Sequence, residues 1–209
     1  MPDVVTLGES MLRLSVPAGQ TLEESPAFYV HVAGAESNMA VTLARLGTSA
    51  GWISRLPATP LGRRVATWIR GHGVDVSRVL WAPEGRIGAY FVEPAPAPRA
   101  YRVIYDRAHS AFAEIDPAEV DWAFVRSARL LHLTGITPAL GRRSRDLVER
   151  ALREAREERV PVSFDINYRA RLWPPQEARQ TLAPLLQEVA ILLCTLEDAR
   201  MLLEGEPDA

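Results

Sequence analysis

The feature that most constrains the fold is an alternation of short apolar runs with longer helical patterns. Residues 130–133 form a short apolar run typical of a buried strand. Residues 142–159 carry apolar side chains at helical spacing with charged residues between them, which predicts an amphipathic helix. A second apolar run at 160–166 and a second helical pattern at 177–188 follow. Strand–helix–strand order predicts an α/β fold with a mostly parallel sheet flanked by helices.

The same patterns extend over the rest of the chain. They predict strands at 4–7, 12–16, 52–54 and 190–194, and helices at 36–46, 61–71 and 197–203. Two segments break the alternation, because residues 25–32 and 87–105 are strand-like without a helix between neighbouring strands. Prolines 94, 96 and 98 in the second segment suit a hairpin tip or a sheet edge. We therefore expect a small antiparallel β flap beside the main sheet.

Composition excludes several classes of protein. The net charge is −2, which gives no indication of a nucleic-acid or anionic-membrane partner. All 24 basic residues are arginine, so neither a Schiff-base lysine nor the lysine of a Walker-type phosphate loop is present. No apolar run approaches the roughly 20 residues of a membrane helix. A single cysteine, Cys194, lies in an apolar run, and we expect a buried thiol in a cytoplasmic protein.

Two groups of polar residues fall where strands or loops meet helices. Gly34 and Asn38 precede and open the helix at 36–46, where free backbone N–H groups can face a polar ligand. An ordinary loop-to-helix junction would have the same spacing. Asp165, Asn167 and Arg169 follow a predicted strand, and alternation puts them on one side as the chain leaves the sheet. They form either a polar binding face or a solvated strand end.

Two further groups suit a ligand site. Tyr90, Tyr105 and Arg107 lie on the predicted flap, where they could bind hydroxyl and carboxylate groups or simply form an amphipathic surface. Thr195 and Asp198 follow the last predicted strand, where the acid could approach a metal ion or cap the helix. The four histidines show no metal-ligand spacing, and His132 alternates with apolar neighbours as a core residue does.

Together these stretches resemble the PfkB-type, ribokinase-like carbohydrate kinases. The resemblance rests on five motifs in the family's order, and the last three are most similar to the 2-keto-3-deoxygluconate kinase branch. The motifs are Gly8-Glu9, Gly34-x-x-x-Asn38, Tyr105 to Ala111, Leu133 to Thr137, and Asp165 to Trp173, which contains Asn-Tyr-Arg-x-x-Leu-Trp.

The resemblance implies a fold, a site and a reaction. The expected fold is one ribokinase-like domain over 1–209 with lid segments at about 11–33 and 87–107. The expected reaction is ATP- and Mg²⁺-dependent phosphorylation of a sugar or sugar acid, with 2-keto-3-deoxygluconate as the expected substrate and a homo-oligomer formed through the lid. The implied sugar-site residues are Gly34, Asn38, Tyr90, Tyr105, Arg107, Ile136 and Arg169. Asp165, Asn167, Thr195 and Asp198 would lie near the nucleotide and Mg²⁺. Two arginines in the site favour an anionic sugar acid over neutral fructose, because each guanidinium needs an anionic partner.

The sequence departs from the family at the catalytic segment. In such kinases an Asp in a Gly-Ala-Gly-Asp turn takes the proton from the sugar hydroxyl. No Gly-x-Gly-Asp occurs in the 209 residues, so no residue of this chain is assigned that role. We therefore expect a domain truncated at its C-terminus that does not transfer phosphate alone. Two alternatives stay open, namely a non-catalytic sugar-binding or dimerising protein and a fructokinase-like kinase.

Overall fold

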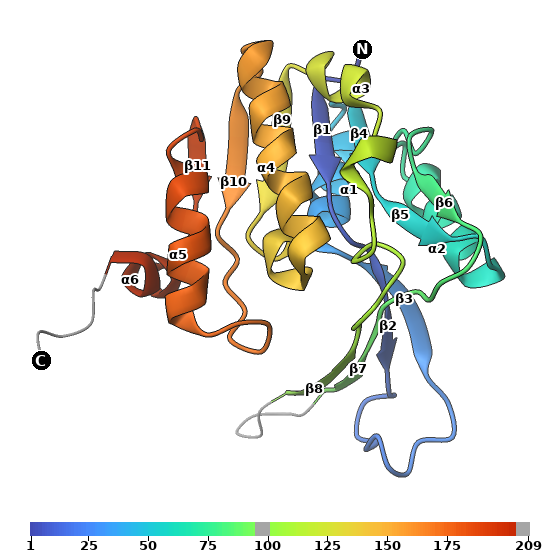
Figure 1. Cartoon of the computed structure of the whole chain (residues 1–209). Helices are drawn as coiled ribbons and strands as arrows, with labels where there is room; N and C mark the ends of the chain where they lie inside the picture. Colours follow the sequence, from blue (N-terminus) through green and yellow to red (C-terminus); the bar gives the residue numbers. More distant parts are fainter. Residues whose placement is uncertain (95–100, 204–209) are drawn as a thin grey trace, which may run out of the picture.

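A five-stranded parallel sheet forms the centre of the molecule in a computed structural model, which describes residues 1–94 and 101–203. In spatial order its strands are Ile191–Leu193 (β11), Val162–Asp165 (β10), Leu130–Thr134 (β9), Val4–Leu7 (β1) and Ala50–Ile53 (β4). Every neighbouring pair runs parallel, so their carboxyl ends meet at one edge (Figure 1). The predicted α/β fold is confirmed.

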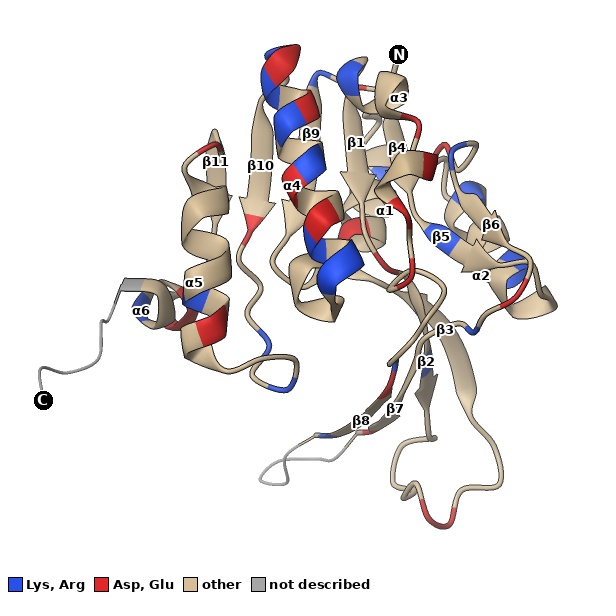
Figure 2. Cartoon of the chain, viewed as in Figure 1, with Lys and Arg blue, Asp and Glu red and all other residues tan. Residues whose placement is uncertain are grey.

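Helices cover the sheet on both faces because apolar side chains alternate along its strands. One face buries Val5, Leu131 and Phe164 against helices Trp122–Arg126 (α3), Arg142–Glu157 (α4) and Pro175–Leu186 (α5). The other face packs Trp52 against Ala35–Arg45 (α1) and Pro60–Gly71 (α2). The outer side of α4 carries both signs of charge in alternation (Figure 2). Because both cores are closely packed, the sheet is a rigid support for the loops at the carboxyl ends of its strands.

A second, four-stranded sheet lies beneath that carboxyl edge and is called the lid here (Figure 1). Its order is Tyr29–Ala33 (β3), Met11–Ser15 (β2), Ala89–Glu93 (β7) and Arg102–Asp106 (β8). The outer pairs are antiparallel, but β2 and β7 run parallel, so the expected antiparallel flap is a mixed sheet. The difference arises because two hairpins lie side by side with their inner strands in the same direction. Prolines 96 and 98 lie outside the described residues.

Smaller elements complete the chain. Strands Arg55–Pro57 (β5) and Leu80–Ala82 (β6) pair in a two-stranded sheet that the sequence patterns did not predict. Short 3₁₀ turns at Pro117–Glu119 and Thr137–Leu140 precede α3 and α4. Helix Leu196–Leu203 (α6) follows β11. None of the helices in the described part of the chain is long and apolar enough to cross a membrane.

One expectation, that of a buried thiol at Cys194 beside the edge strand β11, is wrong. Cys194 follows β11 directly and is exposed rather than buried. Ile191, Leu192 and Leu193 are also exposed, at 48%, 49% and 40%. Burial of an apolar run depends on the neighbours of its strand, and β11 is the last strand of the described sheet, with a partner strand on one side alone. An apolar run alone therefore could not establish that this thiol is enclosed.

Candidate functional site

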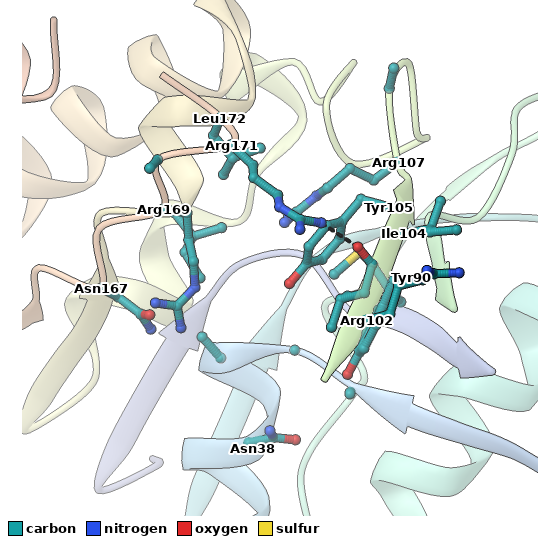
Figure 3. A pocket seen from close by; sticks show the side chains of 18 residues that line it. Asn38, Tyr90, Arg102, Ile104, Tyr105, Arg107, Asn167, Arg169, Arg171 and Leu172 are labelled. Atoms are coloured by element: carbon teal, nitrogen blue, oxygen red, sulfur yellow. Dashed lines mark hydrogen bonds between the residues drawn. The ribbon is translucent and has the colours of Figure 1, made fainter. Parts of the chain in front are cut away.

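One large cavity lies between the lid and the carboxyl edge of the central sheet (Figure 3). Its volume is about 1120 Å³, which is ample for a small sugar. The seven residues predicted for the sugar site all line this cavity, although they come from five separate segments of the chain. They are Gly34, Asn38, Tyr90, Tyr105, Arg107, Ile136 and Arg169. Their role in binding stays a prediction, but their convergence defines the candidate site.

The start of α1 forms one wall of the cavity. Gly34 precedes the helix, and a β-carbon there would lie only 2.3 Å from the backbone oxygen of Glu9. Only glycine lets the two segments approach this closely. Asn38 lies one turn into the helix, and its side chain faces the cavity in Figure 3. The Gly34-x-x-x-Asn38 motif therefore marks a close backbone contact as well as a polar wall.

The lid supplies an aromatic wall. Tyr90 on β7 and Tyr105 on β8 are directly opposite each other in register. Their rings lie 5.4 Å apart at an interplanar angle of 31°. Burial raises the pKa of the Tyr90 hydroxyl, so this group stays protonated and can donate a hydrogen bond. Two neighbouring phenols offer apolar ring surface and hydroxyl groups together, which suits a sugar.

Arg107 reaches the cavity from the end of β8, but it is already paired. Its Nε donates to Oε2 of Glu9 at 3.0 Å, and one terminal nitrogen donates to the same oxygen. Ser110 donates to the other oxygen of Glu9. Glu9 is 4% exposed, so this is a buried ion pair between the lid and the end of β1. The argument that two arginines of the site, Arg107 and Arg169, need the carboxylate of a sugar acid as partner therefore does not hold for Arg107, whose partner is Glu9.

The segment after β10 places a second guanidinium, that of Arg169, at the cavity. Arg169 donates to the backbone oxygen of Tyr168 at 3.1 Å and has no carboxylate within 4.0 Å among the described residues. Asn167 has a φ of 44°, a left-handed conformation that asparagine tolerates well. That turn breaks the strand alternation, so Asn167 and Arg169 line the cavity while Asp165 does not. Arg171, a residue that sequence reasoning missed, also lines it and donates to the carbonyl of Val103 on β8.

Thr195 and Asp198 serve the local backbone. Asp198 accepts hydrogen bonds from the backbone N–H of Tyr168 at 3.2 Å and from the Thr195 hydroxyl at 2.8 Å. Its own N–H donates to the Thr195 oxygen at 3.1 Å, which completes a reciprocal helix cap. Asp165 is half-buried, and burial raises the pKa of its carboxyl. No group of three His, Cys, Asp or Glu residues that could hold a metal ion occurs in residues 1–94 and 101–203. The placement of Asp165, Asn167, Thr195 and Asp198 near a nucleotide and Mg²⁺ stays a prediction.

Sequence reasoning also missed Glu36, which lies beneath the cavity. Its carboxyl group is buried, and it accepts hydrogen bonds from the hydroxyls of Thr134 and Thr137 at 2.7 and 2.8 Å. Burial raises its pKa from 4.5 to about 7, although the two threonines oppose the shift. Charged residues are rare in protein cores. The first turn of α1 is rich in polar residues, so the sequence pattern did not indicate that Glu36 points inward.

Comparison with known proteins identifies the family to which this arrangement belongs. The profile of the pfkB family carbohydrate kinases matches residues 1–208. The chain belongs to the pfkB family of carbohydrate kinases. Among curated pfkB-like relatives, it is 43% identical over 207 residues to the 2-dehydro-3-deoxygalactonokinase of Haloferax volcanii, covering 99% of this chain and 65% of that protein. The 2-dehydro-3-deoxygluconokinase of Thermoproteus tenax is 35% identical, with coverage of 97% and 62%.

Solved structures agree with the pfkB assignment. The 2-dehydro-3-deoxygluconokinase of Thermotoga maritima superposes with a TM-score of 0.92 at 40% identity, over 99% of this chain and 64% of that one. A ribokinase II from E. coli, solved with ATP and Mg²⁺, has a TM-score of 0.88 at 20% identity and shows the shared fold alone. The chain thus spans 62% to 65% of the length of the two curated relatives named above.

Proposed function

We propose that this chain forms the sugar-binding part of an ATP-dependent kinase that phosphorylates a hydroxyl of a 2-keto-3-deoxy sugar acid, with 2-keto-3-deoxygluconate as the substrate. The observation that carries the proposal is the charge of the cavity. Four arginines line it, at positions 102, 107, 169 and 171, whereas no Asp or Glu does among the described residues. Such a wall favours an anion over a neutral sugar.

Arg169 is the residue that the proposal assigns to the substrate carboxylate. Its guanidinium points into the cavity in Figure 3, and within residues 1–94 and 101–203 it donates a hydrogen bond to the backbone carbonyl of Tyr168 and forms no ion pair. A planar guanidinium can donate two parallel hydrogen bonds to a carboxylate, which fixes the direction in which the sugar lies. Arg107, whose charge Glu9 neutralises, would then act as a hydrogen-bond donor. Asn38, Tyr90 and Tyr105 would bind the hydroxyl and keto groups.

The chemical step of the proposed reaction needs groups that these residues do not supply. A general base must take the proton from the sugar hydroxyl, and donors or a metal ion must neutralise the transferring phosphoryl group. The sequence contains no Gly-x-Gly-Asp, and Asp198 is engaged by the chain's own donors. The contribution of the present residues is therefore to bind and orient the sugar, and we expect no ADP formation from the 209 residues and MgATP.

Binding calorimetry tests the proposal. We expect the chain to bind 2-keto-3-deoxygluconate and to discriminate against fructose, a neutral ketose. Arg169→Gln should weaken binding of the acid by about fivefold to tenfold, because a charge-assisted pair with an exposed guanidinium is lost. Arg129→Gln is the matched control, since Arg129 is exposed and pairs with Asp3 at the opposite end of β1. Equal affinity for fructose and the acid would favour the fructokinase-like alternative.

The lid is proposed to mediate a homo-oligomer as well. One of its faces carries a row of apolar side chains, Val30, Leu14, Phe91 and Ile104, of which Val30 and Ile104 are 36% and 50% exposed. A non-catalytic sugar-binding protein, the other alternative, would share both the cavity and this face. The presence or absence of a phosphoryl-transfer segment in the complete protein distinguishes the two.

A further inference from the structure

The carboxyl group of Glu36 is buried and is enclosed by Gly8, Thr134 and Thr137. The side chain is 1% exposed. A β-carbon at residue 8 would lie 2.1 Å from the Glu36 carboxyl carbon, so only glycine at that position leaves room for the group. Thr134 and Thr137 both donate to Oε1. A buried carboxyl with two directed donors and a glycine opposite it has one defined position.

This carboxyl group connects two segments that line the cavity. Glu36 itself lies in the first turn of α1, between Gly34 and Asn38. Thr134 donates to Glu36 and at the same time accepts from the backbone N–H of Ile136 at 3.3 Å. Gly34, Asn38 and Ile136 are cavity residues, whereas Glu36 is not. Glu36 therefore stabilises backbone segments that line the cavity, although its own side chain does not line the cavity.

The charged groups around Glu36 are few. Helix α1 packs against β1, β4 and β9. Titratable groups on or just beyond these strands are Glu9, which pairs with Arg107, Arg55 after β4, and His132, whose pKa is lowered to about 4 by burial. Arg107 on the lid favours the ionised form of Glu36 only weakly compared with burial, which is the largest influence on its pKa. The carboxyl group therefore changes charge near neutral pH, at about 7.

We propose that Glu36 is a positioning residue that makes the affinity of the cavity for a sugar acid depend on one proton. The inference rests on the proposed function. When Glu36 is protonated, the base of the cavity is neutral. When it ionises, a negative charge appears in a poorly solvated region next to the backbone of Gly34 and Ile136, which lines the cavity, and such a charge disfavours an anionic ligand there. Linkage then requires that binding of the acid favours protonation of Glu36, so that binding takes up a proton.

Calorimetry over a range of pH provides the test. We expect the dissociation constant of 2-keto-3-deoxygluconate to rise about fivefold between about pH 6 and about pH 8. Repeating the titration in buffers of different ionisation enthalpy should reveal proton uptake on binding near pH 7. Glu36→Gln keeps an oxygen for both threonines but cannot ionise, so its affinity should not change over this range. Thr137→Val removes a donor that favours the ionised form, so the midpoint should move to higher pH.

Glu154→Gln is the matched control. Glu154 is also a buried glutamate, but it lies on α4 and pairs with Arg126 and Arg150, away from the cavity. This variant should keep the pH profile of the unaltered chain. A pH-independent affinity, or an unchanged profile in Glu36→Gln, would overturn the inference and leave the proposed function standing. Absence of binding at every pH would overturn the proposed function, and the inference with it.

Discussion

Two buried side chains, Glu36 and His132, have opposite effects on how stability depends on pH. Burial raises the pKa of Glu36 from 4.5 to about 7 and lowers that of His132 from 6.5 to about 4. The contribution of Glu36 to folding is fully present below 4.5 and is lost as pH rises to about 7. The contribution of His132 is fully present above 6.5 and is lost as pH falls to about 4. Between 4.5 and 6.5 the two effects cancel.

Glu36→Gln should therefore uncover the effect of His132. In this variant we expect the free energy of unfolding to fall as the medium is acidified from pH 6.5 toward about 4, with a limiting slope of about 1.4 kcal/mol per pH unit. The unaltered chain should show a flatter profile over the same range. Urea unfolding at a series of pH values measures both. Parallel profiles for the two proteins would show that Glu36 is not protonated in the folded state.

At the scale of elements, a side-chain hydrogen bond joins the lid to the segment after β10. Arg171 donates to the carbonyl of Val103 and so joins that segment to β8 across the cavity (Figure 3). Arg171→Ala should loosen β8, because a hydrogen bond from a charged donor contributes about 1.5–3 kcal/mol. We expect faster amide hydrogen exchange in β8. Arg156→Ala, which removes an exposed pair with Glu188, is the control and should leave exchange in β8 unchanged.

The elements that the sequence predicted are those whose pattern is local. Helix α4 has apolar residues at regular spacing and appears at Arg142–Glu157, and His132 is buried as expected. The pairing of Glu9 with Arg107 joins residues 98 positions apart, so no local sequence pattern predicts it. The exposure of Cys194 depends on the neighbours of β11, which periodicity does not describe. The family motifs predicted seven residues that line one cavity. The positions of Glu36 and Arg171 became evident only from the three-dimensional packing.

At the scale of the whole molecule, the lid presents an apolar row across all four strands. Val30, Leu14, Phe91 and Ile104 are directly opposite one another in successive pairs, and cross-strand neighbours point to the same face. Phe28 packs edge-on against Phe91, with ring centroids 5.8 Å apart. Val30, Phe28 and Ile104 are 36%, 39% and 50% exposed. Strand β3, at the edge of this row, carries no charged residue (Figure 2).

An exposed apolar row of this kind favours association with a second copy through the same face, because a twofold interface needs a surface that complements itself. We expect the chain to sediment as a dimer at micromolar concentration. Phe91→Asp places a charge at the centre of the row and should shift the equilibrium to the monomer by at least about tenfold in dissociation constant. Leu46→Asp, which changes an exposed leucine just beyond α1, is the control and should leave the dimer intact. A monomer in the unaltered chain, or a dimer that survives Phe91→Asp, would show that this face is not the interface.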